Sequence, residues 1–432
     1  MTARPAGGVV ARRTAGRRRD FPGWRMVWAL AVTETVAYGV LFYSFAVFLV
    51  PMQRDLGAST VQLSGALTVA MAVTGAAAIG VGRWLDRHGA RWLMTAGSLL
   101  GAACVVGWSQ VRTLPQLYLV FTGIGLASAA VLYEPAYAVI NTWFRRDRRA
   151  ALLTLTVVAG FASTVFLPTS QALIDGLGWR GALLVLAGLV ALCAVPQALL
   201  LRRSPADLGL APDGDGDGGQ PDVVPAGPRA SPAGAAAPWR HPAVRRLTLA
   251  TALEMLAITA VAVHLVAHLL ERGAPPALAA AAAGALGAMS VAGRVVLTAL
   301  AGRLGLGRVT AALIAGQAVG VALLFALPQP LATVLFVLLF GAGFGVIHIA
   351  RPALLGTYVP ATVFASVSGG QALAGQAGRV VAPVAAGALI STAGYGVAFG
   401  AVAACTVAAA GLVLSAERAA ARGFTPEPGA PR

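Results

Sequence analysis

The chain has 432 residues, of which 58% are hydrophobic and 11% are charged, and its formal net charge at pH 7 is +16. A soluble domain carries about 25% charged residues, so this composition excludes an ordinary soluble protein. All 32 basic residues are arginine, and the three cysteines lie far apart without metal-ligand spacing. Because no phosphate-binding loop or nucleophile–base pair is recognisable either, we expect no metal, no cofactor and no enzymatic activity.

Twelve apolar runs follow an arginine-rich stretch at residues 1–25. Most of them reach the length of about 20 residues that a helix needs to cross a bilayer. We therefore predict an all-α membrane protein with twelve transmembrane helices. The predicted spans are residues 26–50, 61–82, 92–110, 115–140, 150–172, 180–201, 244–270, 276–300, 309–327, 331–355, 363–390 and 395–416.

The arginines are distributed unevenly between alternate loops. With the N-terminus placed in the cytoplasm, 25 of the 32 arginines fall in cytoplasmic segments or at the span ends next to them. Four fall in outside loops or at the span ends next to those, and Arg294, Arg351 and Arg379 fall deeper within spans. This distribution follows the positive-inside rule. It explains the basic composition without nucleic-acid binding, and it predicts a multi-pass protein of the plasma membrane with both termini in the cytoplasm.

The middle of the chain is rich in Pro, Gly, Asp and Ala, which predicts a disordered cytoplasmic linker. Asp213 within it begins an Asp-Gly repeat that matches the start of a calcium-binding loop. The bidentate glutamate that such a loop requires would fall at Val224, so we do not expect calcium binding. The predicted divisions are a cytoplasmic tail at 1–25, an N-terminal six-helix bundle at 26–201, the linker at 202–243, a C-terminal six-helix bundle at 244–416 and a cytoplasmic tail at 417–432.

The two halves share short sequence matches at a nearly constant offset. Residues 82–91 and 302–308 both begin with Gly-Arg, join two apolar runs and lie 220 residues apart. Gly178-Trp179 matches Gly394-Tyr395 at an offset of 216. Each half has an even number of spans, so the repeats should share one orientation in the membrane. A duplicated membrane chain predicts two pseudo-symmetric bundles around a central pathway, the architecture of a transporter.

The loop between the second and third spans contains Gly82, Asp86, Arg87, Gly89 and Arg91. Glycine allows two helices to approach closely, and the arginines are expected to stay at the cytoplasmic surface. The pattern resembles the signature loop of the major facilitator superfamily and stands at the same place in a twelve-span duplicated chain. The resemblance implies the major facilitator fold, with this loop as a conformational latch rather than a substrate site.

Further motifs narrow the resemblance to the branch of that superfamily that is similar to monocarboxylate transporters and oxalate/formate antiporters. This branch tends to carry a substrate-binding arginine where Arg294 stands. It often has a lysine embedded in the first or eleventh span, which this chain lacks, and Arg379 is the candidate substitute. The motifs are Gly23-Trp24, Tyr43-Ser44-Phe45, Leu117-Tyr118, Gly123-Ile124-Gly125, Tyr133-Glu134-Pro135, residues 143–150, Pro168 and Gly178-Trp179-Arg180.

Three arginines and three glutamates lie within the predicted spans. A charge at the membrane centre costs about 2.5–3.5 kcal/mol, so these side chains must face protein or water. An arginine stays positively charged and binds a carboxylate through two parallel hydrogen bonds. We therefore expect Arg294 and Arg379 to bind an anionic substrate; the alternative is that they pair with Glu34, Glu134 or Glu254.

Glu34 and Glu254 occupy the same place in the first span of each half, 220 residues apart. A glutamate in a poorly hydrated cavity suits a proton carrier, so one of them is a candidate for coupling transport to protons; the alternative is a structural partner for arginine. Tyr38 follows Glu34 by one helical turn. We expect Tyr38, Tyr133 and Tyr137 to contact the substrate, with Tyr133 and Tyr137 on one helix face.

Glu134 and Arg351 stand at matching positions in the fourth and tenth spans, at an offset of 217. Opposite charges at pseudo-symmetric positions can close a pathway when two bundles rock together. We therefore predict that this pair forms a cytoplasmic gate.

Together these features predict a secondary active transporter that moves a small organic anion, a monocarboxylate or dicarboxylate, by alternating access. Proton coupling and anion exchange are both open. One alternative is an exporter of a drug-like compound or secondary metabolite, and a remote one is a non-transporting membrane receptor. The expected partners are the anionic substrate, protons and the lipid bilayer, with no nucleic acid, and the chain is expected to be a monomer.

Overall fold

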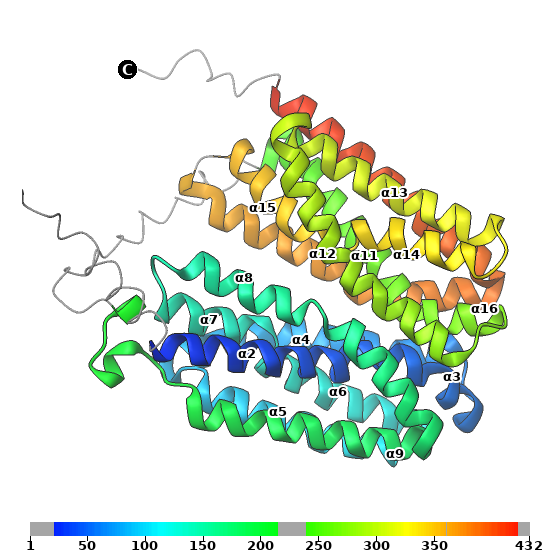
Figure 1. Ribbon diagram of the computed structural model, residues 1–432, viewed down its shortest axis with the longest axis horizontal. Helices are drawn as coiled ribbons and strands as arrows, with labels where there is room; N and C mark the ends of the chain where they lie inside the picture. Colours follow the sequence, from blue (N-terminus) through cyan, green and yellow to red (C-terminus); the bar gives the residue numbers. More distant parts are fainter. Residues whose placement is uncertain (1–20, 215–238, 360, 422–432) are drawn as a thin grey trace, which may run out of the picture. The chain divides into compact units, whose positions relative to one another are not determined.

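The computed structural model describes residues 21–214, 239–359 and 361–421. Every regular element in these ranges is a helix (Figure 1). The prediction of an all-α protein is therefore confirmed.

The helices form two compact units. The described residues of the first unit come from Met1–Phe45 and Val69–Pro221, and those of the second come from Ala46–Thr68 and Asp222–Arg432. The second unit thus contains nearly all of α3 (Phe45–Leu56) and the first residues of α4 (Thr60–His88), together with the C-terminal half of the chain.

The helices begin where the sequence favours initiation. Pro22 starts α2 and Pro242 starts α11, and a first-turn proline has no N–H to leave unpaired. Thr113 and Gln116 form a capping box at the start of α6. The N-terminal half contains α2 (Pro22–Tyr38), the π-helix η1 (Gly39–Tyr43), α3 (Phe45–Leu56), α4 (Thr60–His88), α5 (Arg91–Ser109), α6 (Leu114–Val131), α7 (Tyr133–Trp143), α8 (Arg148–Ala159) and α9 (Ala162–Leu200). The C-terminal half contains α11 (Pro242–Glu271), α12 (Pro276–Leu304), α13 (Leu306–Ala326), α14 (Leu331–Gly343), α15 (Val346–Tyr358) and α16 (Ala361–Ala421).

Ten helical stretches in the described part of the chain are long and apolar enough to cross a membrane. Two of them, Ala150–Leu200 and Val367–Ala421, have 51 and 55 residues, enough for two crossings each. Each turns at a glycine with positive φ, Gly178 at 69° and Gly394 at 81°, a conformation that strains other residue types. The ten stretches therefore make twelve spans, as predicted, and both turns fall where the internal repeat matched.

The fourth and tenth spans are each interrupted. Leu132 has an extended backbone and separates α6 from α7, while residues 344–345 separate α14 from α15. Membrane helices are often interrupted where the chain forms a binding site. The predicted residues Tyr133 and Arg351 lie on the short helices that follow these two breaks.

The segment after the sixth span is ordered as far as Gly214, although the sequence predicted a disordered linker there. Two short 3-10 helices, η2 (Pro205–Leu208) and η3 (Pro212–Gly214), form in it. The Trp143 indole Nε1 donates a hydrogen bond to the Arg202 carbonyl oxygen at 3.2 Å, and Leu210 packs against the same hydrophobic cluster as Trp143. This apolar contact explains the order. The rest of the predicted linker and tails includes residues outside the described ones, namely 1–20, 215–238 and 422–432.

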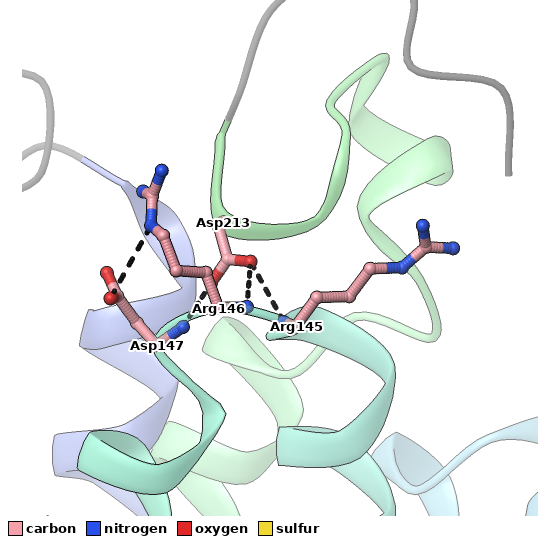
Figure 2. Close-up of polar contacts among 4 residues, drawn as sticks. All are labelled: Arg145, Arg146, Asp147 and Asp213. Carbon is pink, nitrogen blue, oxygen red and sulfur yellow. Dashed lines mark hydrogen bonds and ion pairs between the residues drawn. The ribbon is translucent and has the colours of Figure 1, made fainter. Parts of the chain in front are cut away.

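Asp213 fixes the end of this segment to the first unit (Figure 2). Its Oδ2 accepts hydrogen bonds from the backbone N–H groups of Arg145 and Arg146 at 2.9 and 2.8 Å, and its Oδ1 accepts one from Asp147 at 3.1 Å. These three amides come just before the first residue of α8, where backbone N–H groups lack helical partners. The carboxylate therefore holds the turn that leads into α8, and it binds backbone amides in place of a cation.

Candidate functional site

The second unit brings together the three arginines that lie within spans. Arg294 is on α12, Arg351 on α15 and Arg379 on α16, and all three side chains are partly buried. None of them forms a salt bridge with any described residue of this unit. We call these three residues, together with His348, the arginine cluster. It is a concentration of permanent positive charge without an acidic partner among the described residues of its own unit.

Arg379 contacts two neighbouring helices. Its Nη2 lies 3.1 Å from Nε2 of His348 on α15, and its Nε donates to the Met255 sulfur on α11 at 3.3 Å. A guanidinium group can only donate hydrogen bonds. His348 Nε2 is therefore the acceptor, and the histidine, which the sequence analysis did not select, belongs to the site.

Arg294 lies against the break between α14 and α15. A Cβ atom added at Gly345 would come within 2.7 Å of Arg294 Nη2 and 3.0 Å of its Nε. Arg294 Nε is buried without a hydrogen-bond partner among the described residues. Gly345 therefore leaves space for this guanidinium group beside the first turn of α15.

Arg351 completes the cluster on the same helix as His348. Residues 345, 348 and 351 recur every three positions, which places them on one face of the chain leading into α15. Arg351 Nη1 donates to the Ser368 carbonyl oxygen at 3.3 Å. The charges of Arg294, Arg351 and Arg379 all act on the His348 ring.

The two glutamates predicted to carry protons are fully buried. Glu34 on α2 and Glu254 on α11 are both 0% exposed, and neither carboxyl group has a hydrogen-bond partner among the described residues of its unit. The Gln317 side chain faces Glu254 but makes no hydrogen bond of normal geometry. Glu254 therefore does not pair with the arginines of its unit.

The surroundings of the two glutamates repeat between the halves. Glu34 lies close enough to Cys193 of α9 to act on it electrostatically, and Glu254 acts in the same way on Cys405 of α16. Each carboxyl group thus lies next to the last span of its own half. Both are placed inside the helix packing of their units.

The three predicted tyrosines of the first unit form a continuous aromatic group. The ring centroids of Tyr38 on α2 and Tyr133 on α7 are 4.7 Å apart. Tyr133 and Tyr137 are stacked with centroids 5.2 Å apart and an interplanar angle of 2°. All three rings are partly exposed, so the structure brings these residues together on an accessible surface.

Glu134 is exposed in the first turn of α7, next to Tyr133. Its predicted gate partner, Arg351, belongs to the second unit. The gate therefore stays a prediction.

The predicted latch loop connects α4 and α5. Gly89 has a φ of 76° directly after the end of α4, and Arg91 begins α5. Arg91 Nε donates to the Ala198 carbonyl oxygen of α9 at 2.7 Å, so the loop is tied to the end of the sixth span. The Asp86 side chain lies outside the described part. The other predicted members are in the last turns of α4: Gly82, Asp86 and Arg87.

A duplicated set of twelve membrane spans with charged side chains inside them defines a membrane transport protein. The sequence model of the Major Facilitator Superfamily matches residues 30–383. The chain belongs to this superfamily, whose members are transporters and not enzymes.

Curated relatives with similar sequences are monocarboxylate transporters. Monocarboxylate transporter 1 of Mus musculus is 29% identical over 192 residues, which is 44% of this chain and 38% of that protein. Monocarboxylate transporter 13 of Bos taurus is 30% identical over 262 residues, or 60% of this chain and 56% of that protein. The chain thus spans less than two thirds of the length of these relatives.

Solved transporter structures match nearly the whole chain. A bacterial homolog of the human lysosomal transporter Spinster has a TM-score of 0.73 and 16% identity, covering 96% of this chain and all of that one. The nucleoside transporter NupG has a TM-score of 0.69 and 14% identity, covering 91% of this chain and 99% of that one. At these identities the likeness shows the fold alone.

Proposed function

We propose that this protein is a secondary active transporter that moves a small organic anion, a monocarboxylate or dicarboxylate, by alternating access. The observation that carries the proposal is the arginine cluster of the second unit. Arg294, Arg351 and Arg379 come together from three helices, and no described acidic residue of that unit forms a salt bridge with them.

The physical argument rests on the cost of an uncompensated charge. A guanidinium group cannot lose its proton in a protein, and a charge within a membrane span is costly unless a partner or water compensates it. A carboxylate supplies two oxygen atoms in the geometry that the guanidinium fork prefers. A small organic anion is therefore the ligand that this cluster fits best, and the monocarboxylate transporters among the relatives support this choice.

Proton coupling is part of the proposal, with anion exchange as the other mode. Glu34 and Glu254 are the candidate proton carriers of the transport cycle. An ionised carboxylate that is buried without a hydrogen bond is costly, so each of these groups is favourable in the membrane when it holds a proton.

The remaining predicted roles belong to the same proposal. The tyrosine group contacts the substrate, Glu134 and Arg351 close the cytoplasmic gate, and the loop with Gly89 and Arg91 acts as the conformational latch. We also propose that the protein is a monomer in the plasma membrane. Its termini lie in the cytoplasm in this proposal, because 25 of its 32 arginines then lie inside.

The test is uptake of labelled L-lactate and succinate into proteoliposomes that contain the purified protein, with and without an imposed pH gradient. We expect Arg294→Gln to reduce the initial rate by roughly 10- to 100-fold, because hydrogen bonds to a charged group are worth about 1.5–3 kcal/mol. Arg418→Gln is the matched control, since Arg418 is exposed at the end of α16.

Normal uptake by folded Arg294→Gln protein would contradict the role of the cluster. Uptake of neither carboxylate by the unmodified protein would contradict the proposed substrate class. If cells that express the protein then resisted hydrophobic toxins, the exporter interpretation would be favoured instead.

A further inference from the structure

His348 has an unusual place among positively charged groups. Its Nε2 lies 3.1 Å from Arg379 Nη2, and other parts of the chain do not cover the residue completely. Because the guanidinium donates, Nε2 must carry a lone pair and the ring proton must be on Nδ1. The structure therefore requires a neutral imidazole ring when no anion is present.

Among the described residues of this unit, the charged groups that act on the ring are all positive. Five helices of the second unit, α11 to α14 and α16, pack against α15. Arg294 reaches the ring's surroundings from α12, Arg379 from α16 and Arg351 from α15 itself. A proton on Nε2 would remove the hydrogen bond from Arg379 and add a fourth positive charge.

The other three helices supply no compensating acid at this place. The segment that forms α14 has no ionisable side chain. Glu254 of α11 is fully buried, and Gln317 of α13 faces it. The neighbour of Glu254 on α11, Met255, contacts Arg379 through its neutral sulfur. The ring therefore has no negative charge from the described residues of its unit to stabilise an added proton.

We infer that His348 is the proton-binding group of the anion site and takes up one proton when a carboxylate binds to Arg379. This inference rests on the proposed function. It adds the residue that links the proton to the substrate, a role that the sequence pattern assigned only to Glu34 and Glu254.

The steps follow from hydrogen-bonding capacity. A carboxylate at Arg379 accepts the guanidinium N–H groups, so the Nη2 donor turns from His348 to the anion. Nε2 then has a free lone pair next to a negative charge, and it binds a proton from the surrounding water. The protonated Nε2–H can donate to the carboxylate, so the anion and the proton stabilise one another.

The experiment is calorimetric titration of the purified full-length protein in detergent with L-lactate. Runs at one pH in two buffers of different ionisation enthalpy give the number of protons taken up per lactate bound. We expect about one proton for the unmodified protein, and lactate affinity that falls by up to about tenfold for each unit of rising pH.

Three variants decide which group binds the proton. His348→Gln and His348→Asn keep an amide oxygen that can accept from Arg379 but cannot titrate, so we expect lactate binding with no proton uptake and little pH dependence. His264→Gln is the matched control, because His264 lies in the same unit, contacts the Pro383 carbonyl oxygen at 3.1 Å and is 0% exposed.

The outcomes distinguish proton binding by His348 from the proposed anion transport. Lactate binding without proton uptake in the unmodified protein overturns the role of His348 and leaves anion binding intact. The same follows if either His348 variant still takes up one proton. Absence of lactate binding to the unmodified protein contradicts the proposed function together with this inference. If both variants fail to fold, lactate binding without proton uptake in the unmodified protein still overturns the inference.

Discussion

In the first unit Glu34 is buried within α2, and in the second unit Glu254 occupies the equivalent place in α11. The turns at Gly178 and Gly394 also repeat, each joining the last two spans of its half. These equivalent positions lie in helix packing or at a tight turn. Such places tolerate few side chains. This explains why the two halves have the same residue types there.

The accessible positions after the two helix breaks differ between the units. After the break in the fourth span the first unit has stacked tyrosines and the exposed Glu134. After the break in the tenth span the second unit has His348 and Arg351 within the arginine cluster. The comparison teaches that the two units share a framework of spans and turns but have different side chains after the equivalent breaks, tyrosines and an acid in the first unit and a histidine and an arginine in the second.

The largest expected effect comes from removing a charge of the arginine cluster, which belongs to the second unit. Arg379→Gln should lower the initial rate of lactate uptake into proteoliposomes by roughly 100-fold, because it removes a charge and the donors to His348 and Met255. Arg379→Lys should lose less, since an ammonium group keeps the charge but not the fork. The control is Arg112→Gln, an exposed arginine of the first unit. Equal losses from Arg379→Gln and Arg112→Gln would contradict the contrast between the units.

A second test compares the packing of equivalent glycines. Gly97 on α5 and Gly316 on α13 are 219 residues apart. A Cβ at Gly97 would lie 2.7 Å from the side chains of Ala130 and Val131, whereas nothing lies within 4 Å of one at Gly316. We expect Gly97→Ala to cost about 1–3 kcal/mol of stability. Gly316→Ala should change it by at most about 1 kcal/mol, towards greater stability, because alanine favours the helix.

The readout is the midpoint of thermal unfolding of each purified variant in the same detergent. Gly97→Ala should lower the midpoint, and Gly316→Ala should leave it unchanged or raise it. Equal midpoints for the two variants would show that the units pack alike at this position.

A third test concerns the two buried carboxyl groups. Glu254 directly precedes Met255, which contacts Arg379, whereas Glu34 belongs to the unit without the arginine cluster. A proton gradient directed into the proteoliposomes should stimulate lactate uptake. We expect Glu254→Gln to reduce this stimulation at least about fivefold, because fivefold is the lower end of typical coupling strengths. Glu34→Gln is the matched variant and should reduce it less. A greater loss in Glu34→Gln would place the coupling in the first unit.

Much of the framework was predictable from the sequence because its signals are local. Apolar runs identified the spans. The match of Gly178 with Gly394 at an offset of 216 located the turn between the last two spans of each half. The place of His348 beside Arg379 was not predictable, because this contact joins residues 31 positions apart on different helices. Pro135, in the first turn of α7, is a local signal for the break at Leu132, whereas the first turn of α15 after residues 344–345 has no proline.

The segment around Asp213 shows how composition alone can mislead. Its Pro, Gly and Asp content is typical of a disordered linker. Yet the Asp213 carboxylate binds three consecutive amides, and the hydrophobic cluster around Trp143 holds the preceding residues. The hydrogen bonds of this segment to Trp143 and to residues 145–147 join residues 59 or more positions apart. The sequence around Asp213 therefore does not predict these contacts.

The smallest expected effect on transport belongs to this first-unit contact. Asp213 has a φ of 62°, which asparagine also tolerates, so Asp213→Asn tests the charge rather than the backbone. An amide has one acceptor oxygen, so it cannot serve all three N–H groups of residues 145–147. We expect their hydrogen exchange to accelerate about tenfold or more, which corresponds to about 1.4 kcal/mol, while lactate uptake changes less than about twofold.

Asp207→Asn is the control for that variant, because Asp207 caps its own 3-10 turn through the Ser204 backbone N–H at 3.1 Å. It should leave exchange at residues 145–147 unchanged. If Asp213→Asn also left it unchanged, the negative charge would not be what holds this segment. If instead it reduced uptake as strongly as Arg379→Gln, the first unit would contain a charge as important to transport as those of the arginine cluster. The functional contrast between the two units would then be lost.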